Sequence, residues 1–161
     1  LEGQRGVQRA GVLGFSMGAG VALLVAAQDA RVAALVVDGA FPRLAGLLQG
    51  YLRLRGVPGP LAGGFARVVL GIAALRAQHE IYRANPIVMA GRISAPTLFI
   101  HGERDPFVRT DEVRALAARV AGPAEVWSLA GCGHREANKY HPDEYSRRVV
   151  AWFARHLADG A

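Results

Sequence analysis

The sequence contains a single cysteine, Cys132, among its 161 residues. One cysteine cannot form an internal disulfide, and no cysteines and histidines have the spacing of a zinc site, so a disulfide scaffold and a structural zinc module are excluded. Low-complexity segments and internal repeats are also absent, while 52% apolar and 20% charged residues are close to the globular average. The chain is therefore expected to be an ordinary folded domain held together by side-chain packing.

Positive charge is not clustered, although the formal net charge is +6. All but one of the 19 basic residues are arginines, the exception being Lys139, and they are scattered from Arg5 to Arg155. No pair is more clustered than Arg147 and Arg148, and no aromatic platform is interleaved with them. The distribution therefore argues against a nucleic-acid partner.

Charge is missing altogether from residues 10–27, so a membrane span has to be considered for this stretch. Gly11, Gly14, Ser16 and Gly18 interrupt it and no polybasic flank follows, which favours a strand, a tight turn and a helix. A secretory signal is not recognisable at the start of the sequence, which does not begin with methionine. We therefore expect no membrane span and a cytoplasmic location.

Short buried apolar runs alternate with helical patterns in both halves of the chain, which predicts two strand–helix–strand units with parallel strands. The first unit has a strand at 11–15, an apolar helix at 17–28 and a strand at 32–37. The second has a strand at 97–100, a helix at 111–121 after a Thr110 cap and a strand at 125–129. Together they predict an α/β fold with a parallel sheet of about four strands flanked by helices.

A closing helix is expected from Pro142 to about Leu157, because proline favours the first helical turn and the apolar spacing that follows is amphipathic. Its apolar face contains Tyr145, Val149, Trp152, Phe153 and Leu157.

Residues 41–91, between the two units, mix proline, glycine and arginine with apolar residues. They include an expected helix at 65–75 and a turn near Asn85-Pro86. We interpret this segment as a helical, cap-like insertion within a single domain of residues 1–161. It either lines a substrate pocket or only covers the edge of the sheet.

The motif G-x-S-x-G occurs at Gly14-Phe15-Ser16-Met17-Gly18, where the first strand meets the first helix. In such a nucleophile elbow, a sharp turn forces the serine into a strained backbone conformation and exposes its hydroxyl. Glycines two residues on either side are expected to avoid clashes at the turn. The strand before the motif and the helix after it favour Ser16 as a nucleophile.

A serine hydroxyl is a weak nucleophile and needs a base, which in turn needs an orienting carboxylate. Asp105 lies in the loop after the strand that ends at Ile100, and His134 lies in a glycine-flanked loop after the strand that ends near Leu129. Functional groups gather at the carboxyl ends of parallel strands. We therefore predict that Ser16, His134 and Asp105 converge there as nucleophile, base and orienting acid.

These motifs give the chain a clear family resemblance. The elbow, the segment Ala95–Asp105, the Gly131–His134 loop and the closing helix with Trp152 and Phe153 resemble the C-terminal portion of an α/β-hydrolase. The order serine, aspartate, histidine is that of the α/β-hydrolases. Most similar are the serine-dependent dienelactone-hydrolase-like and prolyl-oligopeptidase-like branches. The resemblance implies a catalytic triad of Ser16, Asp105 and His134, with the backbone N–H of Met17 as one oxyanion donor.

The resemblance also implies that the chain is truncated at its N-terminus. In the family, the second oxyanion donor comes from a loop well before the elbow, whereas only ten residues precede Gly11. The family's sheet order would place the elbow strand at an edge of the sheet, with unpaired backbone groups that invite association. We therefore expect self-association through this edge.

Other polar residues have simpler interpretations. Asp38, after the second strand, is the alternative acid of the triad. Among the remaining histidines, we expect His141 at a helix start, His79 and His156 on the surface, and His101 supporting the Asp105 loop. Cys132 is interpreted as a small filler.

The function that these residues favour is hydrolysis of a carboxylic ester, or else an amide or thioester, through an acyl-enzyme. The substrate would be a small ester or acyl compound, and no cofactor or metal is implied. Two alternatives remain at this point, a catalytically idle fragment or binding module with the same fold and an acyltransferase with the same triad.

Overall fold

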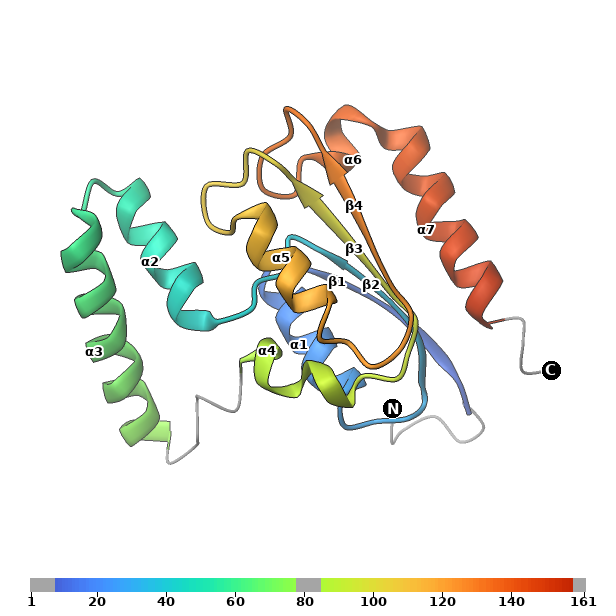
Figure 1. The fold of residues 1–161 in the computed structure, drawn as a ribbon, viewed down its shortest axis with the longest axis horizontal. Coiled ribbons are helices and arrows are strands. Elements are labelled where there is room, and N and C mark those ends of the chain that lie inside the picture. Colours follow the sequence, from blue (N-terminus) through green and yellow to red (C-terminus); the bar gives the residue numbers. More distant parts are fainter. Residues whose placement is uncertain (1–7, 78–84, 158–161) are drawn as a thin grey trace.

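A parallel sheet forms the centre of the computed structural model, which describes residues 8–77 and 85–157 (Figure 1). Within these residues the sheet has four strands in the order β1-β2-β3-β4. They are β1 (Ala10–Phe15), β2 (Val32–Asp38), β3 (Thr97–Gly102) and β4 (Ala124–Leu129). All three neighbouring pairs are parallel, so the carboxyl ends of the strands lie at one edge, as the sequence predicts.

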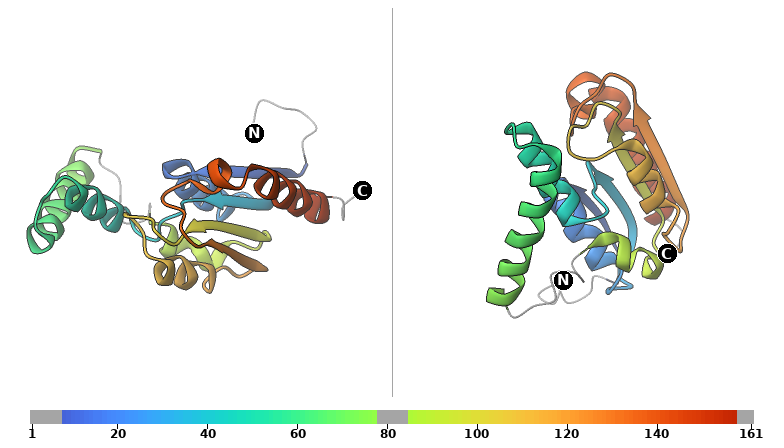
Figure 2. Two further views of the ribbon diagram at one scale, coloured as in Figure 1. Left: turned by 90° about the horizontal axis from the view of Figure 1, so that it is seen from above. Right: turned by 60° about the vertical axis from the view of Figure 1, so that its left-hand side comes forward.

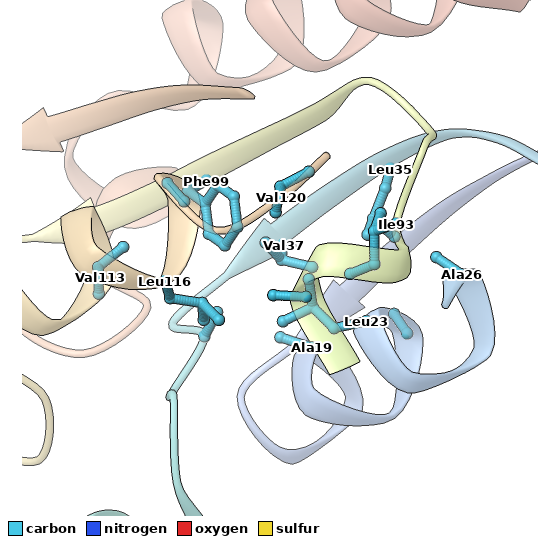
Figure 3. Close-up of a cluster of buried hydrophobic side chains, with 14 of the residues drawn as sticks. Ala19, Leu23, Ala26, Leu35, Val37, Ile93, Phe99, Val113, Leu116 and Val120 are labelled. Atoms are coloured by element: carbon cyan, nitrogen blue, oxygen red, sulfur yellow. The ribbon is translucent and has the colours of Figure 1, made fainter. Parts of the chain in front are cut away.

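Helices cover both faces of the sheet. One face carries α1 (Met17–Ala26), α4 (Pro86–Met89) and α5 (Thr110–Ala117), whereas the other carries α6 (Ala137–Tyr140) and α7 (Pro142–Leu157). Alternate residues of β2 pack against the helices on opposite faces of the sheet, because successive side chains of a strand point to opposite sides. Leu35 and Val37 pack toward α1, and Val36 packs toward α7. Figure 3 shows the first of these two cores.

The predicted closing helix is confirmed as α7. Tyr145, Val149 and Trp152 are buried in the second core, and Phe153 and Leu157 pack partly against it. The spacing of the apolar residues identifies this helix because it is long, strongly amphipathic and opened by a proline.

Several predicted boundaries are wrong. The helix expected at 111–121 begins at Thr110 and ends at Ala117, with Arg109 rather than Thr110 at the cap. The backbone N–H of Arg109 donates to the Glu112 side chain, which fixes the earlier start. The apolar helix expected to reach residue 28 ends at Ala26, where the chain turns into Asp29.

The middle segment is more helical than predicted. It contains α2 (Leu44–Leu54) and α3 (Gly59–Ala77), which extends the expected helix at 65–75 in both directions. The turn expected at Asn85-Pro86 is the start of α4, followed by a 3₁₀ turn at Ala90–Arg92. The α2–α3 hairpin stands apart from the sheet, beyond the carboxyl ends of the strands (Figures 1 and 2).

The free side of β1 leads to a testable prediction. Strand β1 pairs with β2 on one side and with no described strand on the other, and Leu13 and Phe15 are 37% and 38% exposed there. We expect the purified chain to form dimers or larger species at micromolar concentration, and Leu13→Lys to shift it toward the monomer, because a charge on an edge strand opposes strand pairing. Light scattering measures both. A monomeric parent chain would contradict the prediction.

Candidate active site

Ser16 occupies the junction between β1 and α1, in the left-handed region at φ 50°. Such a conformation is costly for a residue other than glycine, so the surrounding structure has to impose it. The N–H of Ser16 donates to the Asp38 carbonyl at 2.8 Å, and the Ser16 carbonyl accepts from the N–H groups of Ala19 and Gly20. Its side chain makes no capping hydrogen bond to α1, which leaves the hydroxyl available for other partners.

The two motif glycines differ in what they contribute. A Cβ at Gly14 would lie 2.7 Å from the Gly18 carbonyl oxygen and 2.8 Å from the Ala19 Cα, so glycine is needed for α1 to pack against β1. A Cβ at Gly18 would meet no described residue within 4 Å, so the expectation that both glycines avoid clashes is wrong for Gly18. Gly20 makes room for the ring of Phe41, 2.7 Å from where its Cβ would be.

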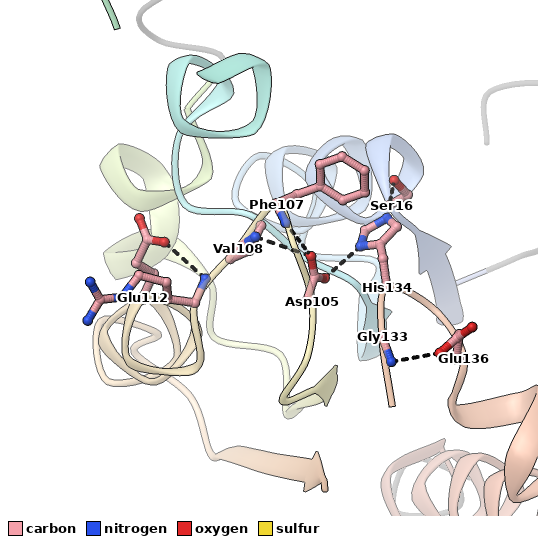
Figure 4. A network of polar contacts seen from close by, with 9 residues as sticks. Ser16, Asp105, Phe107, Val108, Glu112, Gly133, His134 and Glu136 are labelled. Carbon is pink, nitrogen blue, oxygen red and sulfur yellow. Dashed lines mark hydrogen bonds and ion pairs between the residues drawn. The ribbon is translucent and has the colours of Figure 1, made fainter. Parts of the chain in front are cut away.

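Ser16, His134 and Asp105 form a continuous chain of hydrogen bonds (Figure 4). His134 Nδ1 lies 2.6 Å from Asp105 Oδ2, and His134 Nε2 lies 2.9 Å from Ser16 Oγ. Because a carboxylate only accepts hydrogen bonds, Nδ1 carries the proton, and Nε2 is left to accept from the Ser16 hydroxyl. The Asp105 side chain is fully buried and that of His134 is 17% exposed.

Backbone groups after Asp105 fix its carboxylate. Oδ1 accepts from the N–H of Phe107 at 2.8 Å and from that of Val108 at 3.2 Å, which leaves Oδ2 to face the imidazole. The Phe107 ring meets the His134 ring edge-on, with centroids 5.0 Å apart. These contacts were not among those predicted from the sequence. The signal was present, since an aspartate followed by Pro106 favours a turn in which the carboxylate accepts from the backbone two residues on.

Backbone contacts hold the loop that carries His134 against the end of β3. The N–H of Gly133 donates to Glu136 Oε2 at 2.8 Å, and the N–H of Arg104 donates to the Cys132 carbonyl at 2.8 Å. A Cβ at Gly102 would overlap the Gly133 carbonyl oxygen, so the two loops touch backbone to backbone. The Cys132 side chain is buried in the second core, as a filler would be, and burial raises the pKa of its thiol.

Gly39, directly after β2, leaves space for the imidazole and supports a second prediction. It has φ 69°, and a Cβ there would lie 2.7 Å from His134 Cε1. We expect Gly39→Ala to displace the ring and lower kcat/KM for ester hydrolysis by roughly 100-fold, the usual cost of misplacing a reacting group by about 1 Å. Gly56 also has a positive φ, 85°, but none of the residues in the described ranges lies within 4 Å of its Cβ position. Gly56→Ala therefore imposes similar backbone strain without the contact. Equal rates for the two variants would contradict this account.

Asp38, the alternative acid, is engaged elsewhere. Its carboxylate accepts from the Tyr145 hydroxyl at 3.2 Å, is 2% exposed, and has its pKa raised mainly by burial. The hydrogen bond links the end of β2 to α7. The structure therefore places Asp105, and not Asp38, on the imidazole.

Among the described histidines, only His134 forms a hydrogen bond with Ser16. His101 is buried, with no hydrogen-bond partner for its ring among the described residues, so it contacts its neighbours through packing alone. Burial lowers the pKa of the His101 imidazole. His141 directly precedes α7, as expected, whereas His156 is half-buried against Trp152 and so is not the surface residue we expected. His79 lies outside the described residues.

A cavity of about 550 Å³ opens over Ser16 and His134. The other lining residues are Met17, Leu44, Leu47, Leu48, Tyr51, Leu70 and Phe107, which come from α1, from both helices of the hairpin and from the loop after β3. Among the lining residues that the structure describes, only His134 can carry a positive charge, and none is an aspartate or glutamate. Among the described residues, no group of three or more His, Cys, Asp or Glu is placed to hold a metal ion.

Met17 also lines this cavity and begins α1. The first N–H groups of a helix have no acceptor within the helix and carry partial positive charge. The Met17 N–H, next to Ser16 along the chain, is one of these groups, and its role as an oxyanion donor stays a prediction.

Comparison with solved structures identifies the fold. An esterase of Pyrococcus furiosus is 24% identical, with a TM-score of 0.66 over 92% of this chain and 54% of the esterase. An α/β hydrolase from a deep-sea metagenome and a meta-cleavage product hydrolase of Pseudomonas fluorescens are each 20% identical, with TM-scores of 0.63 and 0.62 over 92% of this chain and 66% of theirs. The architecture is thus that of part of an α/β-hydrolase, and the chain spans about half the length of the esterase.

Sequence comparison agrees with the fold. A curated 2-hydroxy-6-oxononadienedioate/2-hydroxy-6-oxononatrienedioate hydrolase of Klebsiella pneumoniae is 40% identical over 65 residues, which are 40% of this chain and 22% of that protein. The dienelactone-hydrolase-like or prolyl-oligopeptidase-like branch stays a prediction. The model of the family Serine hydrolase (FSH1) matches residues 4–135, which is most of the sequence. The chain therefore belongs to the FSH1 serine hydrolase family.

Proposed function

We propose that this chain contributes the catalytic triad of a serine esterase, with Ser16 as nucleophile, His134 as general base and acid, and Asp105 as the group that orients the imidazole. The hydrogen-bond chain from Ser16 Oγ through His134 to Asp105 Oδ2, with distances of 2.9 and 2.6 Å, is the observation that carries this proposal. Membership of a serine hydrolase family supports it.

In the first half-reaction, Ser16 Oγ attacks the ester carbonyl carbon while its proton passes to His134 Nε2. The buried Asp105 carboxylate stabilises the imidazolium that results. The carbonyl oxygen becomes an oxyanion, for which the N–H of Met17 is a donor. The bond to the alcohol oxygen then breaks, and the departing alcohol takes the proton from His134, which leaves an acyl-Ser16 ester.

In the second half-reaction, His134 Nε2 removes a proton from water, whose oxygen attacks the acyl carbon. When the second tetrahedral intermediate collapses, Ser16 Oγ takes the proton back from His134 and the carboxylic acid leaves. The apolar cavity favours an uncharged acyl group, because His134 is the only described lining residue whose side chain can pair with a carboxylate.

Pre-steady-state hydrolysis of p-nitrophenyl butyrate tests this proposal. We expect a burst of about one p-nitrophenol per chain followed by a slower steady rate, which is the signature of an accumulating acyl-enzyme. Intact mass spectrometry after rapid acid quench would show the added butyryl group. Turnover without a butyryl adduct would contradict the acyl-enzyme, and absence of any reaction would favour the idle fragment.

A further inference from the structure

The α2–α3 hairpin exposes an apolar stripe to solvent. Leu61, Phe65, Val68, Ile72 and Leu75 follow one another at intervals of four and three residues, so they lie on one face of α3. They are 65%, 58%, 59%, 49% and 82% exposed. Monomeric soluble proteins rarely expose contiguous apolar surface of this kind without an interaction to explain it.

Helix α3 borders a hollow beside the stripe and also the cavity over Ser16. Leu61, Phe65 and Val68 line a hollow of about 640 Å³ together with Leu52, Val57, Pro60 and Gly64 at the closed end of the hairpin. Leu70, also on α3, lines the cavity over Ser16. One helix therefore contributes to both the outer apolar surface and the predicted acyl site.

The charged residues in and next to the hairpin are all positive. The sequence contains no aspartate or glutamate from Gly39 to His79, but it contains Arg43, Arg53, Arg55, Arg67 and Arg76. All five arginines are exposed. Arg67 and Arg76 lie on α3 next to stripe residues in the sequence, and the other three lie at the ends of α2. Exposed apolar side chains together with arginines and no acids are the pattern of a segment that lies in the interface of an anionic membrane.

We propose that the α2–α3 hairpin docks on the surface of an anionic phospholipid bilayer, with the α3 stripe among the acyl chains and the arginines at the phosphates. Arginine stems lie along apolar surface while their guanidinium groups reach polar groups, which suits this position. As a consequence that rests on the proposed function, the substrate is a lipid ester whose acyl chain passes from the bilayer along α3 into the cavity over Ser16.

Charge complementarity favours a bilayer over a second copy of this chain. Two hairpins packed stripe to stripe would bring together arginines from both copies, and neither hairpin offers an acid to pair with them. A hairpin that crosses the bilayer is also disfavoured. Residues Gly59–Arg76 of α3 have the length and composition to span, but α2 has only 11 residues and ends beside Arg53 and Arg55.

Co-sedimentation with sucrose-loaded vesicles tests the docking, using Ser16→Ala as the parent so that hydrolysis plays no part. We expect at least tenfold stronger partition into vesicles of phosphatidylcholine with 30% phosphatidylglycerol than into phosphatidylcholine alone, since each arginine near an anionic surface strengthens binding severalfold. Raising NaCl from 0.1 to 0.5 M would remove most of the difference through screening.

Two variants test the two parts of the surface, and a third serves as the control. Phe65→Asp tests the apolar stripe, and the double variant Arg67→Glu/Arg76→Glu tests the charge. Each should lower partition into anionic vesicles roughly tenfold or more. Val150→Asp is the matched control, because Val150 is 66% exposed on α7, away from the hairpin, and its partition should equal that of the parent. Thermal unfolding confirms that each variant is folded.

The outcomes distinguish the proposals. Equal partition of the hairpin variants and the parent, or no partition into either vesicle, would overturn docking. A parent dimer that Phe65→Asp dissociates, with no vesicle binding, would assign the stripe to a second copy. If docking holds but neither a vesicle-borne nor a soluble ester is hydrolysed by the chain with Ser16 intact, the proposed function fails while docking stands.

Discussion

Replacing Ser16 by alanine is expected to lower kcat for p-nitrophenyl butyrate roughly 10⁵- to 10⁶-fold, because loss of the nucleophile disables the whole triad at once. The backbone strain at φ 50° should be similar in the variant, because a positive φ is about as costly for alanine as for serine. The folding stability should therefore change little, so that the lower kcat reports the loss of the nucleophile and not unfolding.

Ser146→Ala serves as the control for this experiment. Ser146 is exposed on α7, far along the chain from the elbow, and does not line the cavity over Ser16. Its variant should hydrolyse the ester at the parent rate. A comparable loss of kcat in both variants, or full steady-state activity of Ser16→Ala, would contradict the assignment of Ser16 as the nucleophile.

The second large effect is expected from Asp105→Asn, which should lower kcat about 10⁴-fold. An asparagine amide can donate to His134 Nδ1, and the ring would then carry its proton on Nε2, where it cannot accept from Ser16. The N–H groups of Phe107 and Val108 still hold the side-chain oxygen, so the geometry is retained while the tautomer changes.

Asp38→Asn is the matched control, because it makes the same chemical change at the alternative acid. Its carboxylate contacts Tyr145 and not the imidazole, so we expect kcat within about threefold of the parent. Steady-state rates of the two variants near neutral pH decide between the acids. A large loss in Asp38→Asn with a small loss in Asp105→Asn would reverse the assignment.

The sequence predicts the central layer well because its signals are local. Continuous apolar runs such as 32–37 have to be strands buried on both faces, and the order of the loops along a parallel sheet then brings Asp105 and His134 to the edge where Ser16 lies. The structure places these three side chains within hydrogen-bond distance of one another. Their catalytic roles stay a prediction until the rates are measured.

The sequence predicts a helix at 65–75 but not α2 or the full length of α3, and the reason is physical. Helix α3 is apolar on more than one side and contains several glycines, so no clear amphipathic period marks its limits or shows which face packs on α2. The partners of Asp105 were missed for a different reason. They are backbone N–H groups, which leave no trace in residue identity beyond the turn-forming Asp105-Pro106 pair.

A reactive hydroxyl at Ser16 is the central requirement of the proposed mechanism. Its most direct measurement is treatment of the folded chain with a fluorophosphonate, followed by peptide mass spectrometry to locate the phosphonyl group. We predict a single adduct on Ser16, strongly slowed in His134→Ala and absent from Ser16→Ala. An unlabelled parent chain, or a label on another serine that persists in Ser16→Ala, would contradict it.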